Sequence, residues 1–525
     1  MKRFYMTVTL SLLTTIFSVA QTFEWLRTVP IDYEYNPDMI RYSAVSDQQG
    51  NVYFFGLEEF ETFYNEAMGS QFIKKFNAGG ETLWQRTISG EAAAGGIYIS
   101  IAGDIFLYGE MHSDLDFWGQ LTLYITGITT NGFLVKMDAA GDIVWGLNLE
   151  DLPFESGVVS DIVSVEPDLL YFAYSTWLSS NIVVMSTDGE YITSIVQENV
   201  ALVSGLDTDE EGNIYAAGGC AGWNASFGGV SYPAPFPYTS YVVKYNSDYE
   251  PEWVKFIEDV TCSVLKVKYD HNGGLYLSSQ LFAGTLLDTI QLQGASWVYD
   301  FYLTRLNPVG EFLWALECPQ VLTGDATIGK QQYLSVDPEG NALLAGFTRG
   351  TIDWGNGIVS NTQDYYYNIM IWNVNPLGEI NWIKTAASEG YDDSHSISCD
   401  PQGNVYLAGI AGGTAVFDTI IYETDDFVYP FLAKLNSQAM TAVAENDGKD
   451  EMDVFPNPAN DRIFVHSDEP GEISIYNLQG NKMMELKAES DRQTVGIDDL
   501  PDGSYLLRFQ SSVSPGFKIS RIIVR

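Results

Sequence analysis

FYLTRLNPVGEFLW, the stretch at Phe301–Trp314, decides the fold because the chain repeats it. Apolar residues alternate up to Leu306, the segment Asn307–Gly310 supplies a turn, and a second apolar run ends at Trp314. Alternation on both sides of such a turn predicts a β-hairpin. Related hairpins end at Trp84, Trp145, Trp253 and Trp382. A hairpin repeated along a whole chain predicts a repeat array.

A second kind of turn precedes each hairpin. The segment Asp47–Asn51, DQQGN, leads into the apolar run VYFFG, and close copies lie at 209–213, 337–341 and 400–404. An aspartate that opens a turn can bond the backbone, and glycine accepts a positive φ. One period therefore contains four short antiparallel strands.

The number of periods indicates the architecture. A copy at Asn181–Val196 keeps the turn but lacks the tryptophan, and counting it gives seven periods. Seven four-stranded units predict an all-β fold, a seven-bladed β-propeller over residues 21–441. The repeat, with D-x-x-G-N-V-Y and a later tryptophan, resembles the repeats of secreted bacterial β-propellers of uncertain ligand.

The two ends of the array predict how it closes. The last period ends with the run at Pro430–Asn436, and no tryptophan-bearing strand follows it. A strand of that kind occurs instead at Thr22–Val29, where Trp25 is in register with the repeat. We therefore expect this N-terminal strand to be the outer strand of the last blade, which would protect the open sheet edge.

The connections differ between the two faces of such a fold. Both kinds of turn described above would lie on one face and are short. The connections on the opposite face are long, and length variation on a rigid scaffold is typical of binding surfaces. The longest are Leu57–Ser70, Glu110–Asn131, Gly219–Thr239, Ser279–Asp300, Phe347–Asp364 and Ile410–Tyr429.

Several long connections contain an aromatic residue followed by glycine. Examples are Phe117–Gly119, Phe227–Gly229 and Trp354–Gly355. Because these pieces recur at one place in the repeat, we interpret them as small hairpins that pack on the blade. The alternative is that their rings stack on sugars.

The charge of the chain excludes one class of partner. The formal net charge is −43, which would repel the phosphates of nucleic acid. We interpret the acidic residues as keeping a secreted protein soluble, with cation binding as the alternative.

The first 20 residues predict export. Lys2 and Arg3 precede an apolar stretch from Met6 to Phe17, and small residues follow. This is the pattern of a secretory signal peptide, residues 1–20, with cleavage between Ala20 and Gln21. The stretch is too short for a comfortable membrane span, and no later stretch predicts a transmembrane segment.

The C-terminal part differs in composition. Residues 442–452 are polar and acidic, as in a linker, and residues 453–525 predict a small β-sandwich. This unit resembles the C-terminal sorting domain of the type IX secretion system of Bacteroidota. The resemblance rests on Pro456, Asn457, Pro458, Ile475, Tyr476, Asn477, Gly480, Leu500, Gly503, Tyr505 and the basic end from Lys518 to Arg525.

The resemblance implies a route and a partner. It implies binding to the type IX secretion machinery, passage across the outer membrane, removal of the domain, and release or attachment at the cell surface. A generic carbohydrate-binding sandwich is the alternative for this unit.

Motifs for catalysis or metal binding are missing from the sequence. The four histidines are scattered in it, and HExxH, GxSxG and CxxC do not occur. The segment Asp207–Gly212 begins like a calcium loop, but Gly218 stands where the bidentate glutamate belongs. We predict no catalytic residue, no cofactor and no metal ligand, and we interpret the histidines as loop or turn residues.

The four cysteines allow one disulfide on the long-connection side. We predict a Cys220–Cys262 pair, with Cys262–Cys318 as the alternative, and a buried thiol at Cys399.

Together these patterns predict a monomeric, secreted or cell-surface binding protein. Its ligand, a protein or a glycan, would bind the long-connection face. The alternatives are a polysaccharide hydrolase or lyase with carboxylates on that face, and a structural component of a surface assembly.

Overall fold

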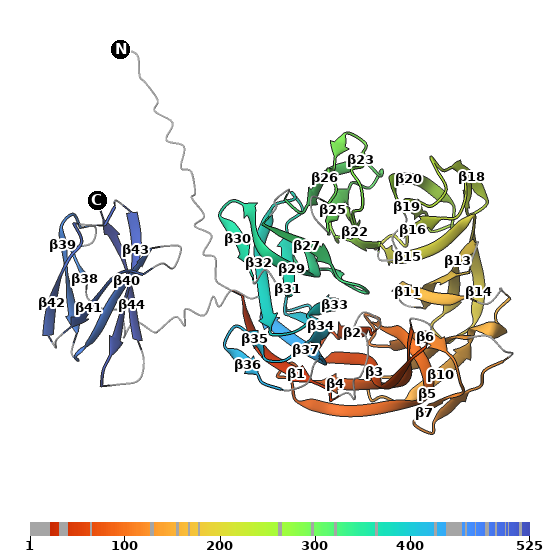
Figure 1. Cartoon of the computed structure of the whole chain (residues 1–525), viewed down its shortest axis with the longest axis horizontal. Coiled ribbons are helices and arrows are strands. Elements are labelled where there is room, and N and C mark those ends of the chain that lie inside the picture. Colours follow the sequence, from red (N-terminus) through yellow and green to blue (C-terminus); the bar gives the residue numbers. More distant parts are fainter. Residues whose placement is uncertain are drawn as a thin grey trace, which may run out of the picture. The chain divides into compact units, whose positions relative to one another are not determined.

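Contacts in a computed structural model divide the chain into two compact units (Figure 1). One is Gln21–Ser437, and the other lies within Gln438–Arg525. The structure describes residues 21–30, 40–63, 66–126, 131–153, 157–165, 168–176, 179–260, 265–295, 299–319, 323–362, 366–424, 428–436, 454–456, 459–467, 469–477, 482–488, 491–498, 500–501, 503–513 and 517–524. The predicted signal peptide and linker lie outside these residues.

Antiparallel strands build the first unit, and its one described helical element is the short turn η2 (Leu149–Asp151). The strands pair in successive groups of four, which we name by their first strand. The first group contains β2 (Tyr42–Ser46), β3 (Val52–Phe63), β4 (Glu66–Phe76) and the start of β5 (Thr82–Ile99). The long strand β5 is shared, because its end begins the second group, which continues with β6 (Ile105–Met111), β9 (Asn131–Met137) and β10 (Ile143–Asn148). The third group contains β11 (Val158–Val165), β12 (Leu169–Ser175), β13 (Ser179–Ser186) and β14 (Tyr191–Glu198).

The remaining groups follow the same order. They are β15 (Val200–Thr208), β16 (Ile214–Cys220), β19 (Thr239–Tyr245), β20 (Pro251–Val260); β21 (Lys266–Tyr269), β22 (Leu275–Gln280), β25 (Phe301–Leu306), β26 (Phe312–Glu317); β27 (Gly324–Ile328) with β28 (Leu334–Val336), β29 (Ala342–Gly355), β31 (Asn368–Val374), β32 (Ile380–Ser388); and β33 (Asp393–Cys399), β34 (Val405–Ala411), β37 (Tyr429–Asn436), β1 (Thr22–Thr28).

The first strands of the groups contact one another in a cycle. β2 contacts β5, β5 contacts β11, β11 contacts β15, and β15 contacts β21; β21 then contacts β28, β28 contacts β33, and β33 returns to β2. Figure 1 labels β2, β11, β15 and β33 toward the middle of the first unit.

Antiparallel order fixes two ends for every group. The turn between the first and second strands and the turn between the third and fourth strands share one end, which we call the short-turn face. The connection between the second and third strands lies at the other end, the long-connection face.

Small hairpins occupy the long connections. β7 (Leu115–Phe117) pairs with β5, and β17 (Asn224–Phe227) pairs with β14, each the last strand of the preceding group. Phe117 and Phe227 are buried, so the interpretation of the aromatic-glycine pieces as packing hairpins is confirmed there. β7 forms its hairpin with β8 (Leu121–Leu123), and β17 forms its hairpin with β18 (Val230–Pro233). The remaining hairpins pair β23 (Leu286–Leu287) with β24 (Ile290–Gln291), β29 with β30 (Ile358–Asn361), and β35 (Ala415–Phe417) with β36 (Ile420–Tyr422).

A tryptophan on the last strand of one group covers the hairpin turn of the next. Trp314 Nε1 donates to the Pro376 carbonyl at 2.9 Å, and its ring lies over Gly378. Gly378 has φ +85°, and a Cβ there would come within 2.7 Å of the indole. Only glycine combines that backbone conformation with that close approach. The same contact joins Trp84 to Gly141, Trp145 to Gly189, and Trp253 to Gly310.

At the boundary between the β11 and β15 groups, both the tryptophan and the glycine of this contact are missing. Thr193 on β14 takes the tryptophan position, opposite Val184, and Tyr249 with φ +68° takes the glycine position in the following turn. The Tyr249 ring packs instead against Tyr171 at 6.3 Å. Loss of the tryptophan and loss of the glycine therefore occur together.

The N-terminal strand joins the last group to the first. β1 pairs antiparallel with β37, which confirms the predicted pairing of the two ends of the array. Trp25 on β1 donates to the Ala78 carbonyl at 3.1 Å and covers Gly80 in the hairpin turn of the β2 group. β1 thus completes the sheet of the β33 group, and its Trp25 side chain donates a hydrogen bond to the β2 group.

The C-terminal unit contains two sheets. One holds β38 (Val454–Phe455), β39 (Arg462–Ser467) and β42 (Asp491–Gly496); the other holds β41 (Lys482–Ala488), β40 (Gly471–Asn477), β43 (Gly503–Ser511) and β44 (Phe517–Val524). Both sheets supply buried residues to one core, including Ile463, Ile475, Val495, Leu507 and Ile522. This is the arrangement of a small β-sandwich.

Replacement of the indole should destabilise the first unit. Trp314→Ala removes the bond to Pro376 and uncovers Gly378. Because Trp314 is half-buried, we expect a loss of about 2–4 kcal/mol in the free energy of unfolding. Thr193→Ala, at the matching position without the contact, is the control and should cost less than about 1 kcal/mol. Equal losses in urea unfolding of the two variants would contradict this account.

The missing contact should be restorable. Thr193→Trp alone would meet the Tyr249 side chain, and Tyr249→Gly alone would lose its packing on Tyr171. Together they should rebuild the indole–glycine contact. We expect a double-mutant cycle to give a favourable coupling of about 1 kcal/mol. Additive single effects would show that the two departures are unrelated.

Candidate functional site

Exposed aromatic side chains concentrate on the long-connection face. Of the seven that the structure describes as exposed in the first unit, six lie in long connections and Tyr191 does not. Exposed clusters of this kind mark binding surfaces more often than single exposed aliphatic residues do. The six are Tyr124, Trp223, Tyr238, Phe282, Tyr299 and Tyr366.

The connection between β16 and β19 presents two of these rings. Trp223 is 58% exposed and Tyr238 is 63% exposed. Ala234 N donates to the Trp223 carbonyl at 2.9 Å, which closes the loop around β17 and β18. Three alternate prolines in 233–237 restrict the backbone before Tyr238, whose φ is +68°. The rings are therefore carried on a backbone with little conformational freedom.

A second aromatic cluster lies where the β21 and β27 groups meet. Tyr299 packs edge-on against Tyr367 at 5.6 Å and against Phe347 at 5.8 Å, and the latter two rings are 5.0 Å apart. Tyr299 is 39% exposed, whereas Phe347 is buried. The cluster thus has one ring turned toward solvent on a packed base.

An ion pair adjoins this cluster. Arg349 Nε and Nη2 donate to the two carboxylate oxygens of Asp325 at 2.9 and 3.2 Å. The guanidinium carbon lies 4.6 Å from the centre of the Tyr367 ring. Asp325 is buried, and the Arg349 side chain is 17% exposed. A bidentate pair stacked on a ring holds its donors in a fixed plane.

Asp300 follows Tyr299 in the chain and, unlike Tyr299, is buried. Burial raises the pKa of Asp300 to about 7, although Phe301 N and Cys318 N both donate to it. Its Oδ2 atom is buried without a hydrogen-bond partner among the described residues. The side chain is 2% exposed, so it can affect a ligand at Tyr299 only through the cluster.

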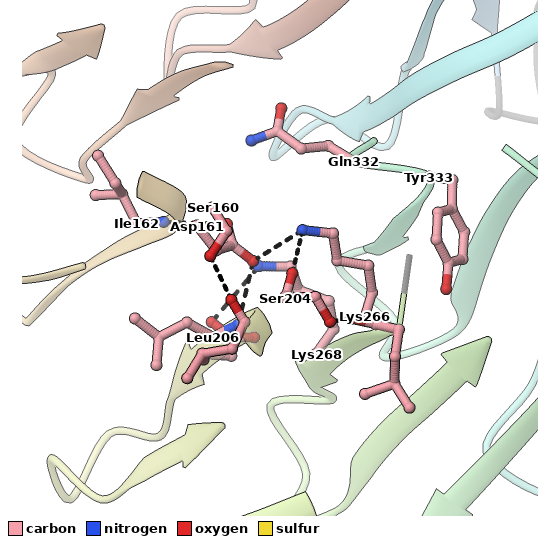
Figure 2. A network of polar contacts seen from close by, with 12 residues as sticks. Ser160, Asp161, Ile162, Ser204, Leu206, Lys266, Lys268, Gln332 and Tyr333 are labelled. Carbon is pink, nitrogen blue, oxygen red and sulfur yellow. Dashed lines mark hydrogen bonds and ion pairs between the residues drawn. The ribbon is translucent and has the colours of Figure 1, made fainter. Parts of the chain in front are cut away.

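Charged residues on the first strands of the groups form ion pairs across group boundaries. Figure 2 shows Lys266 directed at Asp161 and Ser204, with Gln332 and Tyr333 nearby. Lys266 Nζ lies 3.4 Å from Asp161 Oδ2 and also donates to the Ser204 carbonyl, while Leu206 N donates to the same carboxylate oxygen at 3.1 Å. This network ties the β11, β15 and β21 groups together, and burial lowers the pKa of Lys266.

A segment between β27 and β28 reaches to distant groups. Gln332 Nε2 donates to the Ile97 carbonyl of β5 at 3.3 Å, and Gln331 Nε2 donates to the Gly95 carbonyl. Ser43 of β2 donates to Gln331 Oε1 at 2.9 Å. Because β27 and β5 are not neighbours in the cycle of first strands, these bonds cross its interior.

A buried charged cluster lies at the start of β33. Lys330 forms an ion pair with Asp393, and the His395 Nε2 atom lies 3.7 Å from the same carboxylate. Burial would raise the pKa of Asp393, but Lys330 and His395 lower it. Burial lowers the pKa of His395 to about 4, and its Nδ1 atom accepts from Tyr42 N at 3.1 Å.

The structure tests the predictions made for the histidines and for the calcium-like segment Asp207–Gly212. The expectation that every histidine lies in a loop or turn is wrong for His395, which is a buried residue of β33 that packs beside Tyr42. It is also wrong for His466, which lies on β39. Asp209 in the calcium-like segment accepts bonds from Glu211 N, Asn213 N and the Tyr215 hydroxyl, so its oxygens serve the turn. Among the described residues, no group of acidic, histidine and cysteine side chains could hold a metal ion.

The predicted disulfide stays a prediction, because Cys262 lies outside the described residues. Cys220 ends β16 and is buried, as is Cys318. Cys399 lies on β33 with a half-buried free thiol. Burial raises the pKa of both the Cys220 and Cys318 thiols to about 12.

The predicted sorting-domain residues spread over the C-terminal unit. Tyr505 is buried on β43, and its hydroxyl donates to the Pro501 carbonyl at 2.8 Å. Leu500 is buried, and Pro456 is exposed after β38. Ile475, Tyr476 and Asn477 lie on β40, Gly503 begins β43, and Lys518 lies on β44. Asn457, Pro458, Gly480 and Arg525 lie outside the described residues.

Sequence reasoning located the long-connection face but missed its second cluster. Asp325, Arg349 and Tyr367 are far apart in sequence and belong to no motif, so nothing in their spacing indicates a site. The proline alternation before Tyr238 was a usable signal for a rigid, exposed loop.

Comparison with known proteins identifies the C-terminal unit. Residues 453–525 match the family described as the secretion system C-terminal sorting domain. Curated proteins of similar sequence were not found. No helix among the described residues is long and apolar enough to cross a membrane.

Solved structures with partial likeness have diverse activities. The chain is similar to PorZ, a bacterial surface component of the type IX secretion system of Porphyromonas gingivalis, at 13% identity and a TM-score of 0.30, covering 93% of this chain and 70% of that one. It is similar to the polysaccharide lyase Uly1 at 9% identity and a TM-score of 0.39, covering 78% and 93%. Dipeptidyl peptidase 4 of P. gingivalis follows at 11% identity and a TM-score of 0.31, covering 86% and 65%.

TM-scores of this size identify no shared activity. The matched sorting domain does identify a destination. The chain carries a type IX sorting domain at residues 453–525 and is a secreted or cell-surface protein.

Proposed function

We propose that residues 21–437 form a seven-bladed β-propeller that binds a protein or glycan through its long-connection face. The type IX route would deliver this propeller to the cell exterior. The cyclic contact of the first strands, with β1 joined to both the last and the first group, supports the propeller. Signal-peptide cleavage before Gln21 belongs to the same proposal.

The distribution of exposed aromatic rings carries the binding proposal. Six of seven described exposed rings occupy one face, while Lys266 and Lys330, on and beside the first strands, are held in ion pairs with Asp161 and Asp393. Rings of this type supply contact area at low entropic cost and are enriched at binding hot spots. The short turns of the other face are occupied by contacts between groups.

A screen with a matched variant tests this function. The quadruple variant Trp223→Ala, Tyr238→Ala, Tyr299→Ala and Tyr366→Ala removes four long-connection rings, and Tyr191→Ala removes the exposed ring that lies elsewhere. We expect a ligand found on glycan and surface-protein arrays to lose at least about 100-fold in affinity with the first variant and less than about twofold with the second. Equal affinity in both variants would overturn the assignment of the face.

Two neighbouring carboxylates favour an enzyme as the second candidate. Burial raises the pKa of Asp392 to about 8, whereas the pKa of Asp393 is lowered beside Lys330. Two carboxylates, one with a raised pKa and the other with a lowered pKa, can serve as a general acid and a general base. Both are almost fully buried, however, and Ser388 N and Oγ donate to Asp392. Polysaccharide cleavage lost in Asp392→Asn would establish the enzyme; we expect no cleavage by the wild-type protein.

The raised pKa of Asp392 predicts a pH-dependent difference in stability. The folded chain keeps this proton where the unfolded chain, with a pKa near 3.8, has lost it. The free energy of unfolding of the wild type should therefore fall, relative to that of Asp392→Asn, as pH rises from about 4 to about 8. Above this window the difference should be constant. Parallel unfolding curves at pH 5, 6, 7 and 8 measure it, and a pH-independent difference would refute the raised pKa.

A further inference from the structure

We infer that Tyr299, Asp325, Arg349, Tyr366 and Tyr367 form a subsite for one sugar ring of a neutral polysaccharide. The inference rests on the proposed function, since it places the ligand on the long-connection face. It adds a ligand class and the residues that recognise it.

The polar part of the subsite is built on paired strands. Asp325 of β27 stands opposite Arg349 of β29 in register. Their bidentate bonds at 2.9 and 3.2 Å, and the Tyr367 ring 4.6 Å from the guanidinium carbon, hold the pair in one orientation. Buried Asp325 holds the partly exposed guanidinium in place, so that its N–H donors keep a fixed plane, which suits a hydroxyl group of a sugar ring.

The apolar part is the ring of Tyr299. It packs on buried Phe347 and half-buried Tyr367 and is itself 39% exposed. Tyr366, 42% exposed, precedes Tyr367 in the chain and adds a second exposed ring. A pyranose has one face of C–H groups, which packs on an aromatic ring while its hydroxyl edge bonds polar groups.

The described rim of the subsite carries hydroxyl and amide groups. Thr323 Oγ1 donates to the Thr351 carbonyl at 2.8 Å, and Thr351 Oγ1 donates to Asn361 Oδ1 at 2.9 Å. These residues extend the same β27–β29–β30 sheet beyond the ion pair. Hydroxyl and amide groups around a small aromatic platform suit a hydroxylated ligand better than the broad apolar core of a protein interface.

Charge decides against anionic glycans. The Arg349 guanidinium is already paired with Asp325, and the chain carries a formal charge of −43. A uronic-acid or sulfated polymer would meet this field with no unmatched cation in the described cluster to offset it. A neutral polymer is not repelled.

Affinity measurements on separate variants test the subsite. The probes are soluble neutral polysaccharides (xylan, mixed-linkage β-glucan, mannan and starch) and the anionic polymers alginate, pectin and chondroitin sulfate. We expect binding of at least one neutral polymer, a loss of about tenfold with Tyr299→Ala and with Tyr366→Ala, and a loss of less than about threefold with Tyr299→Phe. Tyr191→Ala is the matched control and should bind like the wild type.

The polar pair requires a milder change. Arg349→Lys keeps the charge but loses the bidentate fork, so we expect about tenfold weaker binding with retained unfolding temperature. If this variant unfolds, the exposed Tyr299 and Tyr366 variants still decide the inference.

The outcomes separate the inference from the function it rests on. Unchanged affinity in Tyr299→Ala and Tyr366→Ala, with loss in the quadruple variant, overturns the subsite but keeps the binding face. Preference for an anionic polymer, or binding of a protein without any neutral glycan, also overturns the subsite. Failure of every glycan and protein probe to bind the wild type counts against both.

Discussion

An indole lying over a left-handed glycine is the contact on which the first unit depends. Each such tryptophan belongs to the last strand of one group, and each such glycine belongs to the hairpin turn of the next. The contact therefore joins neighbouring groups at their short-turn ends. At their other ends, the small hairpins β7, β17 and β35 pair with the last strand of the preceding group. Burial of the ring and the bond from its Nε1 atom stabilise the packing of neighbouring groups. Trp25 on β1 applies the same contact across the junction of the two chain ends.

The tryptophan contacts lie on the short-turn face of the first unit, whereas most of the exposed aromatic rings lie on its long-connection face. Five hairpin turns, those with Gly80, Gly141, Gly189, Gly310 and Gly378, are covered by neighbouring indoles. Asp161, Lys266 and Lys330 are paired with residues of other groups. The long connections carry small hairpins that pair with neighbouring strands, and they expose other aromatic rings to solvent. Trp223 and Tyr299 lie there on rigid supports.

Much of this architecture was predictable because its determinants are local. A turn, its aspartate, its glycine and the following tryptophan lie within a few residues of one another, so repetition reveals them. The pairing of β1 with β37 followed from counting strands. The sorting-domain signal is likewise a series of short motifs, and the family match at residues 453–525 agrees with it.

The rest depends on contacts that sequence spacing does not encode. Asp325 meets Arg349 through strand register, and Tyr299 meets Tyr367 across a group boundary. Gln331 reaches β5 from a segment that resembles an ordinary connection. The burial of His395 also depends on tertiary packing, since its ring stacks on Tyr42 of another group. Single-chain patterns therefore predicted the scaffold and the face, but not the cluster.

Hydrogen–deuterium exchange with bound ligand measures most directly which face carries the function. The free protein and its complex with the polysaccharide or protein selected by array screening would be compared peptide by peptide. The account predicts slower exchange in residues 219–239, 279–300 and 347–367 on binding, and unchanged exchange in the short turns 77–80, 307–310 and 375–378. Protection of the short turns, with unchanged exchange in the long connections, would contradict it.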